Sequence, residues 1–148
     1  MKNINLVYGT MNGEAKFVAS ELSNYLTEKS AHHHLYEPIE LSGWTPPENE
    51  LLIIVCSSTG YGDLPDEIYP WFLELETKAP YLPTLEYGLV GLGDSSYDIF
   101  CGAIVQFETL LADLGATAIQ PTLKLDATEH YAPERDAEKW LSDYVTSL

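Results

Sequence analysis

The stretch Leu51-Leu52-Ile53-Ile54-Val55-Cys56 decides the fold class of this chain. It is an uninterrupted apolar run between a connection that contains Gly and Pro, residues 42–50, and a polar loop, residues 57–65. An apolar run without alternation is typical of a strand buried on both faces, as in a parallel sheet covered by helices. The run therefore predicts an α/β fold built on a parallel sheet.

On both sides of this run, short apolar segments alternate with longer amphipathic ones. The short segments predict further strands at residues 4–8, 34–41, 87–93 and 118–125. Pro38 suits an edge position for the second of these. Apolar residues at steps of three and four predict helices at residues 14–29, 66–78 (capped by Asp66), 103–114 and 133–148. This alternation predicts one doubly wound, three-layer domain over residues 1–148.

The composition excludes several classes of protein. Lysine and arginine together number 7 and aspartate and glutamate 23, so the net charge is −16. That balance argues against binding to nucleic acids or anionic membranes and favours partners with a positive surface. The sequence shows neither a signal peptide nor an apolar stretch of about 18 residues, so we expect a cytoplasmic protein without a membrane partner. Cys56 and Cys101 predict free thiols in a reducing compartment, although a disulfide between them stays open.

Three loops directly follow predicted strands, at the edge where such sheets bind ligands. The first, Gly9-Thr10-Met11-Asn12-Gly13-Glu14, leads into a helix start. Its hydroxyl, amide and free helix N–H groups can hold an anion without a cation. It lacks the Lys of a Walker loop and the GxGxxG spacing of a dinucleotide loop. Two interpretations remain from these residues: a loop for a phosphate monoester, or an ordinary turn with a helix cap.

The other two loops have features that suit a flat ligand. Residues 57–66 contain Gly60 and Gly62, which let peptide groups approach or turn toward such a ligand. Residues 94–101 contain Tyr97 among polar neighbours, where no core requires an aromatic side chain. Tyr97 is therefore well placed to stack on a planar ring.

Three motifs in this order carry a resemblance to a known family. They are Tyr8-Gly9-Thr10…Gly13…Ala15, Ser58-Thr59-Gly60-Tyr61-Gly62-Asp63-Leu64-Pro65-Asp66 and Gly91-Leu92-Gly93-Asp94-Ser95-Ser96-Tyr97-Asp98-Ile99-Phe100-Cys101-Gly102. Over essentially its whole length the chain resembles the flavodoxin-like FMN-binding proteins, with a particularly close match to the MioC-type small flavoproteins. The last two motifs also resemble the FMN domains of diflavin reductases. The resemblance implies a three-layer sandwich with a five-stranded parallel sheet in the order 2-1-3-4-5, and FMN as cofactor.

The resemblance also implies which residues hold the FMN. Residues 10–15 would wrap its phosphate, with side-chain donors from Thr10 and Asn12 and backbone amides from Met11, Gly13, Glu14 and Ala15. The isoalloxazine would be bordered by Ser58, Thr59, Gly60, Tyr61 and Gly62. Tyr97 would stack on one ring face, beside the backbone of Leu92, Gly93 and Asp94 and a wall closed by Phe100 and Cys101.

Two departures from the family pattern predict weaker FMN binding than in a tight flavodoxin. Glu14 stands where many relatives have Thr or Gly, which brings a carboxylate near the phosphate. Thr59 stands where diflavin relatives often have an aromatic residue. The second ring face therefore lacks cover unless Tyr61 or Trp44 supplies it.

The function that the resemblance implies is electron transfer without catalytic residues of the chain's own. A monomer would take electrons from an NADPH-dependent flavodoxin reductase and pass them to an acceptor enzyme, biotin synthase in the MioC-type family. Carboxylates in the flanking loops predict a docking face for basic partners and a lowered flavin potential: Asp63, Asp66, Asp94 and Asp98. A quinone or azo reductase is the alternative, and NADPH turnover by the protein alone would identify it. A receiver domain is disfavoured because Gly9-Thr10 and Cys56-Ser57 stand where its acidic residues belong.

Other candidate sites have structural interpretations. Consecutive side chains on a strand point to opposite faces, so no metal site is predicted at residues 32–34, a run of histidines. Cys56 is expected to be a small buried residue, and Cys101 has no assigned His beside it that would make it a nucleophile. The paired serines at 57–58 and 95–96 lack a GxSxG elbow, which disfavours a hydrolase.

Overall fold

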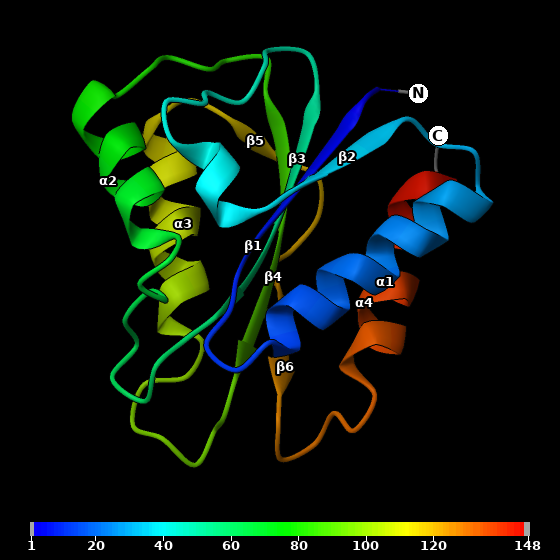
Figure 1. Cartoon of the computed structure of the whole chain (residues 1–148), viewed down its shortest axis with the longest axis vertical. Helices are drawn as coiled ribbons and strands as arrows, with labels where there is room; N and C mark the ends of the chain where they lie inside the picture. The colour runs from blue at the N-terminus through cyan, green and yellow to red at the C-terminus, as the bar shows by residue number, and fades with distance from the viewer. Residues whose placement is uncertain (1, 147–148) are drawn as a thin grey trace.

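A parallel sheet forms the centre of the molecule, as the apolar run at 51–56 predicts. The computed structural model describes residues 2–146. Five strands follow the order β2-β1-β3-β4-β5, and a sixth, β6, also pairs with β4 (Figure 1). The strands are β1 (Ile4–Gly9), β2 (His33–Tyr36), β3 (Leu51–Ser57), β4 (Glu86–Gly93), β5 (Thr117–Ala118) and β6 (Leu123–Asp126). The fold class and the order of the first five strands are thus confirmed.

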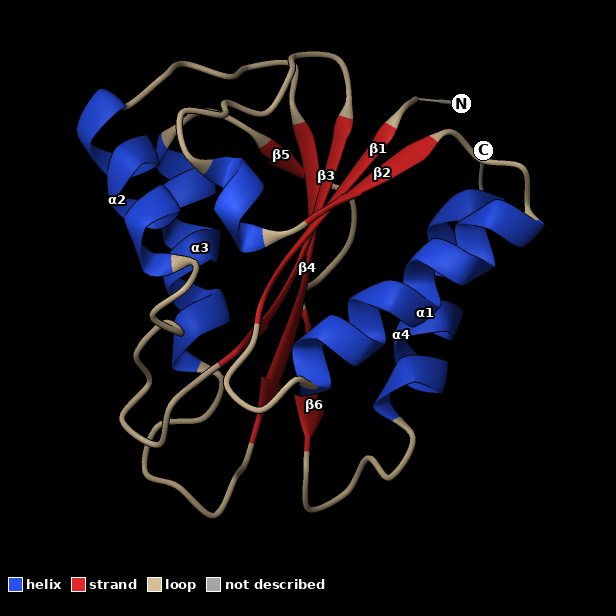
Figure 2. Ribbon diagram, viewed as in Figure 1, coloured by secondary structure: helices blue, strands red, loops and turns tan. Residues whose placement is uncertain are grey.

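Helices cover both faces of this sheet (Figure 2). On one face lie α1 (Glu14–Glu28) and α4 (Pro133–Thr146), and on the other lie α2 (Tyr69–Lys78) and α3 (Gly102–Asp113). Side chains of β3 alternate between the two cores, with Ile53 and Val55 in the first and Ile54 and Cys56 in the second. Both faces of this strand are therefore buried, which explains its unbroken apolar sequence. No helix within residues 2–146 is long and apolar enough to cross a membrane.

The predicted edge strand at 34–41 was wrong in its second half. Strand β2 ends at Tyr36, and Pro38–Leu41 form a short 3-10 helix, η1. Pro38 has no amide hydrogen for a strand ladder, and its fixed φ suits the start of a helical turn. Ile39 consequently points outward with 84% of its surface exposed, whereas Leu41 is fully buried.

The last predicted strand, 118–125, is two strands in the structure. Strand β5 pairs with the start of β4 and β6 with its end, and the chain leaves the sheet between them. Pro121 lies in that excursion and cannot donate to a ladder. Hydrogen bonds with α4 hold this excursion instead. Trp140 Nε1 donates to the Pro121 carbonyl, and Gln120 Nε2 donates to the Trp140 carbonyl.

Helix α2 begins three residues later than predicted, and Asp66 does not cap it. The residue before the helix is Ile68, without a side-chain cap, and the Ile68 and Tyr69 amides both bond the Pro65 carbonyl. Pro70 lies in the first helical turn, where a missing amide costs nothing. Helix α4 is described to Thr146, so the last two residues of the predicted 133–148 helix lie outside the described part of the chain.

Candidate functional site at the carboxyl ends of the strands

The loops after β1, β3 and β4 meet at one edge of the sheet, at the bottom of Figure 2. They enclose a cavity of about 290 Å³. Its lining comes from all three loops and the start of the β6–α4 connection: Met11, Asn12, Glu14, Ser57, Ser58, Thr59, Gly60, Leu92, Gly93, Asp94, Tyr97 and Ala127. Three sequence segments that are far apart in the chain therefore build one site.

The β1–α1 loop presents hydrogen-bond donors at the start of α1. Gly13 precedes the helix with φ of 85°, a left-handed conformation that favours glycine, and no side chain in the described part of the chain caps this terminus. The first amides of a helix have no partner inside it. Next to them, the hydroxyl oxygen of Thr10 is buried and has no hydrogen-bond partner among residues 2–146. This combination of free donors matches an anion site.

Two carboxylates adjoin these donors. Glu67 accepts a hydrogen bond from the Thr10 amide at 2.7 Å, which ties the first loop to the segment before α2. Glu14, in the first turn of α1, is exposed and lines the cavity. Acidic residues are favourable near a helix N-terminus but repel a bound anion. The Glu14 carboxylate thus lies at the cavity beside the first loop, and its predicted weakening of FMN binding stays a prediction.

Thr59 shapes the β3–α2 loop. Its hydroxyl accepts hydrogen bonds from the Asp63 amide at 3.0 Å and the Tyr61 amide at 3.3 Å. The Gly62 amide closes the turn on the Thr59 carbonyl at 2.9 Å. The Ser58 hydroxyl accepts from the Ala103 amide at 2.8 Å and so joins this loop to the start of α3.

Asp126, at the end of β6, holds the β4–α3 loop. Its carboxylate accepts hydrogen bonds from the Ser95 amide at 3.1 Å and from the amide and hydroxyl of Thr128. Hydrogen bonds from Ser95 and then Thr128 lower the pKa of this carboxyl. The Ala127 amide adds a bond to the Gly93 carbonyl at 2.9 Å. The cavity wall at Gly93 is therefore fastened to the β6–α4 connection.

Tyr97 lies across the cavity mouth against Gly60. A Cβ built on Gly60 would stand 3.4 Å from Cδ1 of Tyr97, and 55% of the tyrosine is exposed. A second cavity, of about 400 Å³, lies on the outer side of this contact and is lined by Tyr61, Tyr97, Ile99 and their neighbours. Tyr97 thus borders both cavities.

Most of the predicted ligand-contacting residues line the cavity of about 290 Å³. Those among the predicted residues that do not line it are Thr10, Gly13, Ala15, Tyr61, Gly62, Phe100 and Cys101. Phe100 and Cys101 lie behind the wall, since a Cβ on Gly93 would meet Cys101 Sγ at 2.8 Å and Phe100 Cδ1 at 3.3 Å. Sequence reasoning missed Ser57 and Ala127 in the lining, and Asp126 and Glu67 as supports. An acidic residue directly after the predicted strand that ends at Leu125 was the available signal for Asp126.

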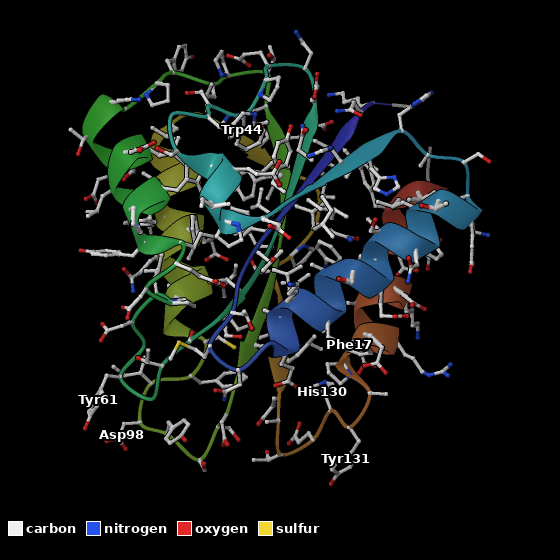
Figure 3. The ribbon with its side chains drawn as sticks, viewed as in Figure 1. Phe17, Trp44, Tyr61, Asp98, His130 and Tyr131 are labelled. Atoms are coloured by element: carbon white, nitrogen blue, oxygen red, sulfur yellow. The ribbon has the colours of Figure 1, made fainter. Side chains whose placement is uncertain are left out.

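Of the two side chains considered as cover for a second ring face, Trp44 lies elsewhere. It packs between Tyr36 and Trp71, with ring centroids 4.5 Å and 5.9 Å away, at the end of the molecule opposite the loops (Figure 3). Tyr61 projects from the β3–α2 loop with 85% of its surface exposed. Tyr61 is therefore the aromatic side chain of these two that the fold places beside the cavities.

The cysteines and histidines have structural surroundings. Cys56 and Cys101 are both buried as free thiols. Burial raises the pKa of Cys56 strongly and that of Cys101 to about 11, so both are protonated at neutral pH and are poor nucleophiles. His33 is bonded to Ser23 and the Ala31 carbonyl, whereas His34 lies beside Glu40. These neighbouring histidines thus face different partners.

Known proteins that resemble this chain include several flavodoxins. The sequence matches the family model for Flavodoxin over residues 6–140. It is 37% identical to Flavodoxin YqcA of Escherichia coli K12 over 148 residues, covering 100% of this chain and 99% of that protein. It is 34% identical to Protein MioC of Escherichia coli K12 over 153 residues, with the same coverage of 100% and 99%. The structure matches a mutant flavodoxin from Pseudomonas aeruginosa with a TM-score of 0.87 and 33% identity, covering 99% of this chain and 98% of that one.

Proposed function

Because this chain belongs to the flavodoxin family, we propose that it carries electrons between two partner proteins on its FMN. FMN is the cofactor of the family and of this chain. When bound, it supplies the redox chemistry, while the protein positions it and tunes its potential. The observation that carries the proposal is the uncapped start of α1 beside the buried, unpartnered Thr10 hydroxyl.

The residues at the strand ends fit this cofactor. The Thr10 hydroxyl and the free amides of α1 are donors without acceptors among the described residues, and a phosphate oxygen can accept their hydrogen bonds. The aromatic side chain of Tyr97 and the peptide group of Gly60 border the same cavity, and both can pack against a planar ring. Donors beside the part of the cavity lined by Met11, Asn12 and Glu14, and flat walls at Gly60 and Tyr97, match the two halves of FMN.

We assign the FMN contacts to the residues that the three motifs predict. Residues 10–15 would hold the phosphate, and Ser58 to Gly62 would border the ring. Tyr97 would cover one ring face beside Leu92, Gly93 and Asp94. Support for these roles comes from the placement of most of these residues around one cavity at the carboxyl ends of β1, β3 and β4.

Carboxylates at the ring edge have two proposed effects. Asp94 lines the cavity, and the exposed Asp63 and Asp98 lie in the loops around it. Negative charges there disfavour the gain of electrons by the ring, so they lower its reduction potential. They also attract a positively charged protein surface. We therefore propose a basic NADPH-dependent flavodoxin reductase as donor and a basic acceptor enzyme, with biotin synthase as the first to test.

A titration with two flavins tests the phosphate assignment. We expect FMN to bind more tightly than riboflavin by orders of magnitude, because each hydrogen bond to a charged group contributes about 1.5–3 kcal/mol. Thr10→Val removes the hydroxyl and should weaken FMN binding at least about tenfold while leaving riboflavin binding unchanged. Thr27→Val is the matched control, since that hydroxyl bonds the Ser23 carbonyl within α1. Equal affinity for the two flavins would sink the assignment.

Stopped-flow reduction tests the role as a carrier. The FMN-loaded protein should be reduced rapidly by NADPH only when a flavodoxin reductase is present, and reoxidised when the acceptor enzyme is added. Rapid oxidation of NADPH by the protein alone, with a quinone or azo dye as acceptor, would overturn the carrier role and favour a flavin enzyme.

A further inference from the structure

A groove runs along the outer side of α2 and α3, away from the cofactor cavity. It encloses about 480 Å³. Phe72 from α2 and Val105 and Leu110 from α3 form its apolar part, Gln106 and Thr109 add polar groups, and the exposed carboxylates of Glu76 and Asp113 stand at its rim. Figure 1 shows the two helices side by side on the same face of the sheet. A third helix can pack into the groove between two adjacent helices whose outer side faces solvent.

This groove continues toward the loops at the strand ends. A smaller cavity of about 330 Å³ is lined by Asp63, Leu64, Asp66, Tyr69 and Gln106, and it shares Gln106 with the groove. Gln106 Nε2 donates to the Gly62 carbonyl at 2.9 Å, which joins α3 to the loop beside the proposed ring site. A segment lying in the groove would therefore end next to the cofactor edge.

The charge around this groove is almost wholly negative. Lys78 is the only lysine or arginine between Lys29 and Lys124. Across α2, α3 and the loops that precede them, the carboxylates are Asp63, Asp66, Glu67, Glu74, Glu76, Asp94, Asp98, Glu108 and Asp113. The other cations lie near the N-terminus, on α1, on β6 or on α4. These two helices and their preceding loops thus carry nine carboxylates against one lysine, a net charge of −8.

Two of the rim carboxylates lie where a helix disfavours them. Glu76 is in the last turn of α2, and Asp113 is the last residue of α3. The C-terminus of a helix carries partial negative charge and favours cations. Both side chains are exposed, and within residues 2–146 neither forms a hydrogen bond or ion pair. Glu76 and Asp113 therefore destabilise the unbound protein, and their position suits a cationic ligand.

We propose that this α2–α3 groove receives a basic amphipathic helix of a redox partner. Its apolar face would cover Phe72, Val105 and Leu110, and its lysines or arginines would pair with Glu76 and Asp113. This is the helix-in-groove mode of recognition, with charge complementarity selecting the partner. The proposal rests on the proposed function for the identity of the partner, but the groove and its charge do not depend on FMN.

A designed peptide tests the groove directly. The probe is a synthetic helix of about 18 residues with leucine at every third or fourth position and lysine elsewhere. Added to the FMN-loaded, ¹⁵N-labelled protein, it should shift amide resonances confined to α2, α3 and residues 61–66. A peptide of the same composition with shuffled leucines, which lacks an apolar face, should bind at least about tenfold more weakly.

Charge reversal separates the groove from general attraction to an acidic protein. Glu76→Lys with Asp113→Lys should weaken peptide binding at least about tenfold and raise Tm, because cations suit helix C-termini. Glu28→Lys with Asp143→Lys is the matched control. It makes the same change in net charge in the last turns of α1 and α4, on the opposite layer. It should also raise Tm but leave peptide binding nearly unchanged.

The outcomes distinguish this proposal from the proposed function. Resonance shifts spread over the whole acidic surface, or an equal loss of binding in both double variants, would overturn the groove. Peptide binding confined to α2 and α3 in a protein that accepts no FMN would support the groove and overturn the carrier role.

Discussion

Single side chains, rather than helices and strands, hold the loops at the strand ends in shape. Asp126 joins β6 to the β4–α3 loop through Ser95, and Thr59 closes its own loop with one hydroxyl. Glu67 reaches the Thr10 amide across 57 positions of sequence. Each of these bonds fixes a loop that strand and helix patterns leave undetermined.

Replacement of Tyr97 tests its proposed stacking on the flavin. Tyr97→Ala should weaken FMN binding about 2–10-fold, the equivalent of the ~0.5–1.5 kcal/mol that an aromatic contact adds beyond area burial. It should also brighten the emission of bound flavin, because contact with tyrosine quenches it. Fluorescence titration measures both effects.

Tyr81→Ala is the control for this substitution. Tyr81 is 76% exposed and precedes β4, at the opposite end of that strand from the cavity. If Tyr81→Ala changes affinity and emission as much as Tyr97→Ala does, the aromatic residue that contacts the ring has been misassigned.

Asp126 predicts a pH dependence of stability. Its pKa in the folded protein is lowered by hydrogen bonds from Ser95 and Thr128, below the unfolded value of ~3.9. The carboxylate therefore stabilises the fold fully above that value, and this contribution is lost as the pH falls through it toward the folded pKa. Urea unfolding should show Asp126→Asn to be less stable than wild type at neutral pH, with a difference that shrinks from about pH 5 to about pH 3.

The control for this pH series is Asp143→Asn, on α4. A difference between Asp126→Asn and wild type that stays constant with pH would contradict the assignment of the stabilising groups.

At the scale of elements, close packing between β4 and the helices sets the distance of both layers from the sheet. A Cβ on Gly88 would stand 2.6 Å from Trp140 of α4, and one on Gly91 would stand 2.5 Å from Ile104 of α3. No side chain fits at either position without movement. The glycines of this strand thus let α3, whose Ala103 amide bonds Ser58 of the cavity lining, lie directly on the sheet.

Gly91→Ala should therefore destabilise the fold by about 1–3 kcal/mol, the cost of overpacking a core. The added methyl group must displace Ile104, which is fully buried. Urea unfolding measures the change in the free energy of unfolding.

A double-mutant cycle identifies the cause of that loss. Ile104→Ala alone should cost about 2–5 kcal/mol, and the pair should cost less than the sum because the new methyl fills vacated space. Strictly additive losses of stability would show that the methyl group at position 91 does not clash with Ile104.

At the scale of the whole molecule, charge is arranged unevenly around the fold. Half of the net charge of −16 lies on α2, α3 and the loops that precede them, where nine carboxylates stand against one lysine, and the other six cations lie elsewhere. Exposed charges act over about 8–10 Å at moderate ionic strength. We therefore expect this acidic face to guide the proposed basic partner to the end of the sheet where the cavity lies.

Neutralising part of this face should slow electron delivery. The triple variant Asp63→Asn, Asp66→Asn and Asp98→Asn should be reduced more slowly than wild type by a basic flavodoxin reductase at low salt. The difference should fade at high salt, where screening has removed the attraction. Stopped-flow rates across a salt series measure it.

Three acidic residues on the opposite layer supply the control, since neutralising Glu134, Glu138 and Asp143 on α4 changes the net charge equally. Equal slowing by both triple variants, or none by the first, would show that the acidic face is only a solvated surface.

The sequence by itself determined the parallel α/β sheet, the four helices and the three loops that form the site. These features depend on short-range patterns: an unbroken apolar run at 51–56, helical spacing, and glycines with polar residues after strands. Such patterns depend on burial and backbone preference within a few residues. They can therefore be interpreted without knowing how the rest of the chain folds.

The tertiary structure alone decided how the site is supported and what lies beside it. Asp66 lost its predicted capping role, Trp44 packed away from the loops, and Glu67 and Asp126 became supports of loops other than their own. The groove between α2 and α3 also emerged only from their packing. The physical reason is that hydrogen bonds and cavities depend on which distant segments meet. A polar side chain in a given local sequence can bond many different groups, and only the fold decides which of them is near.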